Sequence, residues 1–518
     1  MAKSLLRSAV TVGGFTMISR VLGFARDILI AAFLGAGPAA DAFFVAFKIP
    51  NLLRRLFAEG AFNAAFVPSF SALLVQEGRQ AARAFAEDTL AVLATVLIAI
   101  VIAAEIFMPS VMVVLAPGFS DDPEKFALAV ELTRLTFPYI LFISLVALMG
   151  GILNSLDSFA APAATPIVLN LCLIGAMLLL GDVAGTPAHA LAWGVAIAGA
   201  GQFLWLAFSC RLAGLSLGFP VPRLTPRVRA MLILMGPAAL GAGVAQINVL
   251  IDTMLATLLP TGSVSYLYYA DRLVQLPLGV VGVALGTALL PRLSRNIGAD
   301  DETAAQYDQN RAMEAGLLLS LPAAAALIAI GPEIVSVLFQ RGAFDAEQAR
   351  ATASALSAYA LGLPAYVLLK VLAPAYFARH DTRTPVRVAA LCLVVNAVLA
   401  FALMQVFAHV GIALASAVAS WLNATLLAVG LLRSGRYRMD ARFRRRLPRM
   451  AISALAMAAV LWLSARLLAG PLAAGEIAGA LSLAVIVVLG IAVFVAAALA
   501  SGAAAKSDLA MLRRMKQS

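Results

Sequence analysis

The sequence predicts an all-α integral membrane protein with fourteen transmembrane helices, arranged as two six-helix lobes followed by two further helices. The first observation is composition, since 62% of the 518 residues are apolar and only 13% are charged. An ordinary soluble domain has about 45–50% and about 25%. The mean hydropathy is +0.95, so a surface that faces water on all sides cannot be assembled from this chain.

The second observation is the length and number of the apolar stretches. A helix needs about 20 apolar residues to cross a hydrocarbon core of ~30 Å, because every backbone polar group must be satisfied inside the helix. Glycine, proline and charged residues separate fourteen such stretches. They are residues 8–34, 39–76, 86–115, 125–157, 160–181, 187–212, 227–259, 263–298, 306–338, 346–379, 384–407, 409–434, 447–469 and 474–502.

The distribution of cations supports this count. Lysine and arginine concentrate in cytoplasmic loops of membrane proteins, and here alternate loops together with both termini hold 26 of the 38. The opposite set of loops holds four, which are Lys125, Arg134, Arg341 and Arg350. We therefore expect an even number of crossings with both termini in the cytoplasm. The most basic loop, 433–449, is too short a tether for nucleic acid and suits anionic lipids.

The third observation is an internal duplication. The segment at 59–71, EGAFNAAFVPSFS, resembles GVALGTALLPRLS at 282–294, and Pro138 and Pro364 lie at nearly the same offset. Six helices per copy is an even number, so both copies share one orientation, as in transporters with parallel repeats. We predict an N-terminal lobe at 1–215, a C-terminal lobe at 220–435, two helices within 447–502 and a cytoplasmic tail at 503–518.

Three predicted helices carry charges inside the membrane, where an arginine costs about 2.5–3.5 kcal/mol unless it faces a wet cavity. These charges are Arg20, Arg26 and Asp27 on the first helix, Asp41, Lys48, Arg54, Arg55 and Glu59 on the second, and Asp271 and Arg272 on the eighth. Cations outnumber acids, which suits an anionic phosphorylated ligand because guanidinium groups bind phosphate oxygens in pairs. Spacings of seven, seven and four place Asp41, Lys48, Arg55 and Glu59 on one face of the second helix. A kink at Pro50 would change the phase of the residues that follow, so either Arg54 or Arg55 can lie on this face.

These residues resemble a known family. The strings SRVLGFARD at 19–27, DAFFVAFK at 41–48, NLLRRLFAEGAF at 51–62 and YYADR at 268–272 are similar to the MurJ (MviN) lipid II flippases of the MOP exporter superfamily. The resemblance implies transport of undecaprenyl-pyrophosphate-linked peptidoglycan precursor across the inner membrane by alternating access. It implies transport roles for Arg20, Arg26, Arg54 and Arg272, with Asp27, Asp41 and Glu59 as their charged neighbours, and a groove for the lipid tail along the last two helices.

The resemblance also bears on cofactors and partners. Some members bind sodium in the second lobe, and the residues that match here are Asp252, Asn396 and Ser416, although Ala400 replaces one expected ligand. The residue after YYADRLV is often acidic in relatives and is Gln275 here. We expect no other cofactor, and a monomer that binds lipid II and membrane lipids but not nucleic acid.

Two other functions stay open from the sequence. One is transport of a different polyprenyl-pyrophosphate-linked glycan, or export of drugs as in MATE transporters, although the latter predicts cavity helices rich in acids. The other is a membrane enzyme such as a polyprenyl-phosphate transferase, which needs clustered carboxylates. The sequence has no HExxH, phosphate-binding loop or paired-aspartate motif, so we predict that the protein is not an enzyme.

Overall fold

The computed structural model describes residues 2–56, 62–181 and 183–505, apart from the side chains of 2–10, 53, 55, 56, 64, 237–242, 244, 245, 280 and 282–288. Within these residues the secondary structure is helical. The first elements are α1 (Ala2–Leu34), α2 (Pro38–Leu56), α3 (Phe62–Gln76), α4 (Gly78–Ile106), α5 (Met108–Leu115), the 3₁₀ helix η2 (Pro117–Asp121), α6 (Pro123–Thr136), α7 (Tyr139–Ser155), α8 (Ala160–Leu179) and α9 (Pro187–Leu212). The remaining elements are α10 (Pro226–Thr257), α11 (Ser263–Gly298), α12 (Glu302–Ala329), α13 (Gly331–Phe339), α14 (Ala346–Phe377), α15 (Arg383–Arg433), α16 (Ala441–Leu467), α17 (Ala469–Ala473) and α18 (Glu476–Ala500).

Local sequence explains where many of these helices begin. Six of the described helices have an Asp or Thr N-cap whose side chain accepts a hydrogen bond from a backbone N–H of the first turn, and three of those caps precede a proline. Proline suits the first helical position because its missing N–H would have no intrahelical partner there. Thr186 with Pro187 begins α9, and Thr225 with Pro226 begins α10.

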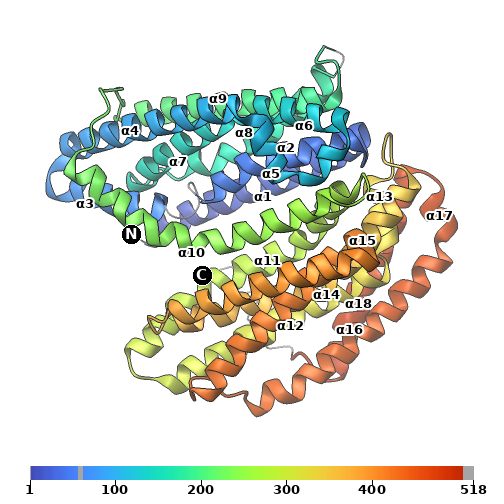
Figure 1. The fold of residues 1–518 in the computed structure, drawn as a ribbon. Coiled ribbons are helices and arrows are strands. Elements are labelled where there is room, and N and C mark those ends of the chain that lie inside the picture. Colours follow the sequence, from blue (N-terminus) through green and yellow to red (C-terminus); the bar gives the residue numbers. More distant parts are fainter. Residues whose placement is uncertain (1, 57–61, 182, 506–518) are drawn as a thin grey trace. The chain divides into compact units, whose positions relative to one another are not determined.

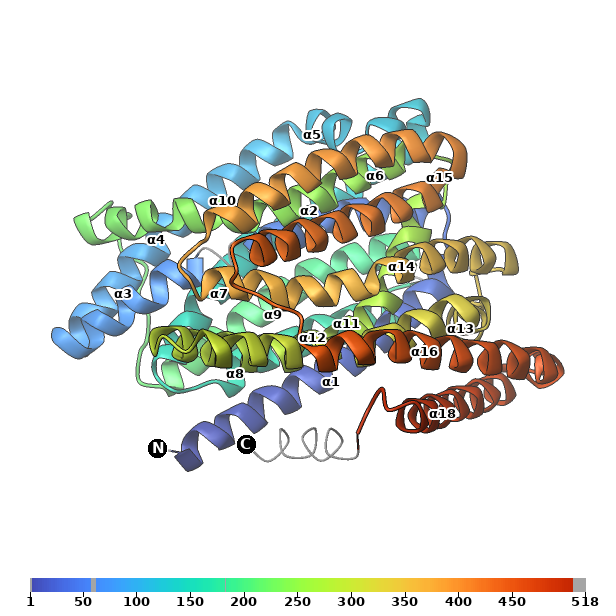
Figure 2. The same ribbon diagram turned by 90° about the horizontal axis from the view of Figure 1, so that it is seen from below.

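The chain divides into two compact units, which are described separately. The first comprises residues 1–265 and 341–344, and the second comprises 266–340 and 345–518. In the first unit α1 packs on α8, α8 on α9 and α9 on α7, while α2 lies against α6 (Figure 1). In the second unit α12 packs on α14 and α16, α14 packs on α15, and α16 lies beside α18 (Figure 2). The boundaries of the predicted lobes stay a prediction.

The outward surface of these helices is apolar. Within the described residues, nine helical segments are long and apolar enough to cross a membrane. In α18 only 22% of the most apolar window is buried, and Leu481, Val485 and Val488 are more than half exposed. Side chains of this kind face lipid, because a soluble protein rarely exposes such a continuous apolar surface.

The helix α15 is longer than one crossing. It has 51 residues, and Ala408, with φ 47° and ψ −132°, interrupts its helical geometry. This break coincides with the boundary that the sequence predicts between helices at 384–407 and 409–434. A residue with a Cβ adopts this backbone conformation at a cost, so the turn at Ala408 is imposed by the packing around it.

Candidate functional site

The first charged group of the site lies in α1 and is buried. Arg26 is 8% exposed and Asp27 is 3% exposed. The Nε and Nη2 atoms of Arg26 donate to Oδ1 of Asp27 at 3.0 and 2.6 Å. The Nη1 atom donates to Oδ1 of Asn170 on α8 at 2.9 Å. A buried guanidinium is thus matched with one carboxylate and one amide, as buried charges require.

Asn170 also fixes the position of α1 relative to α8. Its Nδ2 atom donates to the backbone carbonyl of Ser19 at 2.9 Å. A Cβ on Gly23 would lie 3.5 Å from that same nitrogen, an ordinary van der Waals distance, so the amide packs directly beside Gly23 on α1. The predicted residue Arg20, one residue after Ser19, is half-buried.

The second charged group surrounds Asp41 in the first turn of α2. The carboxylate of Asp41, which is 1% exposed, accepts four hydrogen bonds. They come from Lys125 Nζ at 2.9 Å, Gly262 N at 2.8 Å, and Ser265 N and Oγ at 3.0 and 2.6 Å. The ammonium group of Lys125 also donates to Thr261 Oγ1 at 3.3 Å and lies 4.3 Å from the ring centroid of Phe119.

These contacts give Asp41 a clear local role. Gly262 lies in the turn before α11 and Ser265 lies in the first turn of α11, where the N–H groups have no intrahelical acceptor. The carboxylate of Asp41 caps that helix from another part of the chain, and the charge of Lys125 compensates it. Asp41, Lys125 and Ser265 therefore join α2, α6 and the start of α11.

Of the remaining predicted residues of the second helix, the structure describes the side chain of Arg54. Arg54 is half-buried, and its Nε and Nη2 atoms donate to Oδ1 of Asn51 at 3.2 and 3.0 Å, one turn earlier on α2. The side chain of Arg55 lies outside the described part of the structure, and all of Glu59 does too. Whether Arg54 or Arg55 shares a helix face with Asp41 stays a prediction with both alternatives.

In the second unit the predicted cation is Arg272 on α11. It is half-buried, and its guanidinium carbon lies 4.7 Å from the ring centroid of Tyr268, one turn earlier. This geometry is a cation–π contact, which stabilises a cation in a dry environment. Next to it, Gln275 donates a hydrogen bond to Asp271. The amide of Gln275 thus serves as a hydrogen-bond donor.

The predicted sodium ligands belong to different units. Asp252 lies on α10 in the first unit, where Asn248 Nδ2 donates to its Oδ2 at 3.4 Å. Asn396 and Ser416 lie on the two halves of α15 in the second unit, and Asn396 is 1% exposed. Among the described residues no group of three or more His, Cys, Asp or Glu side chains gathers in a way that would hold a metal ion.

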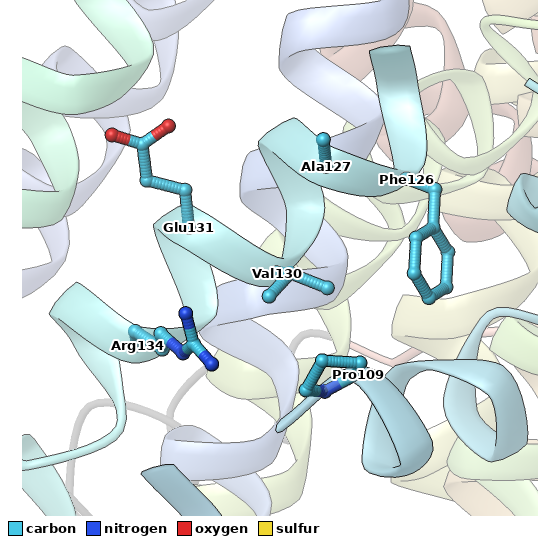
Figure 3. A pocket seen from close by; sticks show the side chains of 6 residues that line it. All are labelled: Pro109, Phe126, Ala127, Val130, Glu131 and Arg134. Carbon is cyan, nitrogen blue, oxygen red and sulfur yellow. The ribbon is translucent and has the colours of Figure 1, made fainter. Parts of the chain in front are cut away.

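A surface hollow of about 560 Å³ lies between α5 and α6. Its lining residues are Pro109, Phe126, Ala127, Val130, Glu131 and Arg134. Figure 3 shows Phe126 and Arg134 at opposite ends of this hollow. None of the predicted site residues lines it, and Glu131 is paired with His189 Nε2 at 3.3 Å. The hollow is therefore separate from the charged groups on α1, α2 and α11.

Sequence reasoning missed Asn170 and the partners of Asp41. Asn170 is a single amide in an apolar helix, without a spacing that connects it to Arg26. Lys125 was visible only as one of four cations in the sparsely charged loops. A cation in a loop set that otherwise has few cations is a signal that it has a structural partner, because a buried cation needs a buried acid nearby.

A helical bundle with outward apolar surfaces and buried arginines is typical of a membrane transporter for a charged substrate. The chain belongs to the MurJ lipid II flippase family, whose sequence profile matches residues 30–483. It is 44% identical over 517 residues to a probable lipid II flippase MurJ of Rhizobium meliloti (strain 1021), which covers 99% of this chain and 96% of the relative. It is 38% identical over 469 residues to the lipid II flippase MurJ of Burkholderia cenocepacia, covering 88% of this chain and 90% of the relative.

Solved structures agree with this assignment. A lipid II flippase MurJ in an inward closed conformation matches with a TM-score of 0.79 at 26% identity, over 94% of this chain and 98% of that one. An inward-facing MATE multidrug transporter of the MOP superfamily matches with a TM-score of 0.68 at 13% identity, over 85% of this chain and 98% of that one. The second likeness concerns the fold alone.

Proposed function

We propose that this protein is a lipid II flippase, which moves undecaprenyl-pyrophosphate-linked peptidoglycan precursor from the cytoplasmic to the periplasmic leaflet. The observation that carries the proposal is the match to MurJ proteins along 99% of the chain, together with the buried arginine on α1. The substrate has a pyrophosphate group, and guanidinium groups bind phosphate oxygens through paired hydrogen bonds.

Alternating access follows from the chemistry of these arginines. All three nitrogens of the Arg26 guanidinium donate to protein atoms, namely to Asp27 and Asn170. A pyrophosphate must therefore compete with these two side chains for Arg26. We infer that substrate binding exchanges the protein contacts of Arg26 for phosphate contacts, and that this exchange favours a different arrangement of α1. A ligand shifts a conformational equilibrium only by such differential contacts.

The proposed topology has fourteen crossings with both termini in the cytoplasm. Nine helical segments of the described structure meet the length and composition of a span, and the break at Ala408 divides one of them into two. The other four are α1, α2, α10 and α11, which carry the intramembrane charges or are described in part. We propose two six-helix lobes of parallel repeat, a monomeric state and the bacterial inner membrane as the location.

Sodium is a proposed cofactor, with Asp252, Asn396 and Ser416 as its ligands. Hard cations prefer carboxylate, amide and hydroxyl oxygens, and these three residues supply one of each. Titration with sodium chloride against potassium chloride, followed by lipid II translocation, tests the site. Equal translocation rates in the two salts would remove sodium from the mechanism and leave the membrane potential as the driving force.

The flippase proposal is tested by reconstituting the full-length protein into vesicles that contain lipid II and measuring how much lipid II becomes accessible on the opposite leaflet. We expect Arg26→Ala and Arg272→Ala to reduce the rate at least tenfold. Arg350→Ala is the matched control, because Arg350 is exposed and its side chain donates a hydrogen bond to the backbone carbonyl of Ala346 in its own helix. Wild-type rates in both the Arg26 and the Arg272 variant would exclude the arginine mechanism, and no translocation by the wild-type protein would exclude the function.

A further inference from the structure

The arginine-rich segment, residues 433–449, has a defined conformation on the surface of the second unit. Tyr437 is 2% exposed, and its hydroxyl donates to Oδ1 of Asn310 on α12 at 3.1 Å. The amide nitrogen of Asn310 donates to the carbonyl of Arg438 at 2.9 Å, and the N–H of Asp440 donates to Oδ1 of Asn310 at 3.2 Å. One buried asparagine and one buried tyrosine therefore hold the segment against α12.

The inner side of this segment is neutralised by acids. Glu314, which is 5% exposed, accepts hydrogen bonds from Arg311, Arg442 and Arg446, with the Arg442 contact at 3.2 Å. Arg311 also pairs with Asp440. These contacts use two carboxylates for three guanidinium groups, so no acid of this cluster is left for the other arginines of the segment.

Arg445 and Arg449 lie on the outer side of α16 and are exposed. Neither forms an ion pair with any described residue, and Arg449 lies next to Gly502 at the end of α18. The two are four residues apart, which places them on one face of the helix. Two cations that share a face repel each other unless an anion lies between them.

The same face of α16 becomes apolar within one turn. Ile452, three residues after Arg449, is 64% exposed, and Leu463 further along this face is 52% exposed. One helical turn rises only about 5.4 Å. Such a sharp change from arginine to aliphatic side chains on an exposed helix face matches the boundary between lipid headgroups and acyl chains.

We propose that Arg445 and Arg449 bind the phosphate group of an anionic phospholipid, whose acyl chains lie along Ile452 and Leu463. A membrane lipid is favoured over a protein or nucleic acid because only a lipid presents an anion and a long apolar chain in this order along one helix face. The segment also has six further arginines, which attract anionic lipids to this leaflet. The inference depends on α16 crossing the membrane and not on the proposed transport of lipid II.

Lipid binding to the purified full-length protein in detergent tests this proposal. The probe is phosphatidylglycerol, with phosphatidylcholine as the zwitterionic comparison, and bound lipid is counted by native mass spectrometry. Each arginine near a membrane surface contributes about fivefold to binding of anionic lipid. We therefore expect Arg445→Gln with Arg449→Gln to weaken the tightest phosphatidylglycerol binding roughly 25-fold, without an effect on phosphatidylcholine.

The matched control is Arg223→Gln with Arg229→Gln, which removes the same charge from exposed positions in the first unit. Equal loss of phosphatidylglycerol in the control pair would overturn the site, because the effect would then reflect net charge. Unchanged binding in the α16 pair would overturn it too, as would displacement of the lipid by 10 mM inorganic phosphate alone, which would identify a free-phosphate site. Should the double variant fail to fold, Arg449→Gln alone is expected to lose about fivefold.

Discussion

Replacing Asp41 by asparagine removes the charge that joins three parts of the first unit. Lys125, 6% exposed, would then be a buried ammonium group without a carboxylate. The new NH₂ group would face either Lys125 Nζ and the N–H of Gly262, which both donate to Oδ2, or the N–H and Oγ of Ser265, which both donate to Oδ1. Breaking a buried ion pair by removing one partner costs about 3–5 kcal/mol. We expect this cost to appear locally, at the start of α11.

Hydrogen exchange of backbone amides measures this effect at the right place. The amides of Gly262 and Ser265 donate to Asp41, so their exchange reports opening of the joint. A loss of 3–5 kcal/mol corresponds to exchange that is roughly 150- to 5,000-fold faster. Asp121→Asn is the matched control, because Asp121 is an exposed acid close to Lys125 in sequence.

A second variant separates the charge pair from the hydrogen bonds. Lys125→Met leaves Asp41 with three neutral donors, from Gly262 and Ser265, so it should cost less than Asp41→Asn. Combining both changes removes the orphaned ammonium group, and we expect the double variant to regain part of the protection. Exchange in Asp41→Asn within twofold of wild type, or a double variant that exchanges as fast as Asp41→Asn, would refute this reasoning.

Three further changes test other parts of the fold by unfolding in denaturant. Glu314→Gln should lower the free energy of unfolding by about 3–5 kcal/mol, whereas Glu302→Gln, at a more exposed pair, should cost about 1 kcal/mol or less; equal effects would contradict the buried cluster. Ala408→Gly should stabilise the protein by about 1 kcal/mol or more, because glycine adopts its backbone conformation without strain, and a destabilised variant would argue against that turn. Hydrogen bonds from Thr384 lower the pKa of Asp381, so its stabilisation is present above the unfolded pKa of about 3.9 and is lost as pH falls through the folded pKa. Asp381→Asn should therefore be less stable than wild type at pH 6 and equal to it in strong acid, and a constant difference would contradict the linkage.

The positions of helices were largely readable from the sequence, because they follow from local chemistry. The break near residue 408 matches the predicted division of the apolar sequence into stretches at 384–407 and 409–434. The starts of α9 and α10 follow from Thr186 and Thr225, each with a proline behind it. Caps, prolines and apolar length act within one or two turns, so a single sequence contains all that is needed to find them.

The ion-pair and hydrogen-bond partners of the charged residues could not be predicted from the local sequence. The family resemblance implies that Asp41 is a charged neighbour of the transport arginines. The structure instead pairs it with Lys125, 84 residues away, and with Ser265, 224 residues away. Electrostatic pairing depends on distance in space, and an apolar helix surface offers many places where a lone charge could lie.

This difference decides how a charge inside the membrane should be interpreted. A cation in a span is expensive whether it binds substrate or a neighbouring acid, so its presence alone does not separate the two roles. Lys125 shows the structural outcome, because a single carboxylate compensates it fully. Arg26 is also compensated by a carboxylate, that of Asp27, but its Nη1 atom donates to the neutral amide oxygen of Asn170, and a phosphate oxygen can replace that amide at a gain in charge pairing. Arg26, at which a neutral hydrogen-bond acceptor can be exchanged for a phosphate oxygen, is therefore the first residue to test in transport.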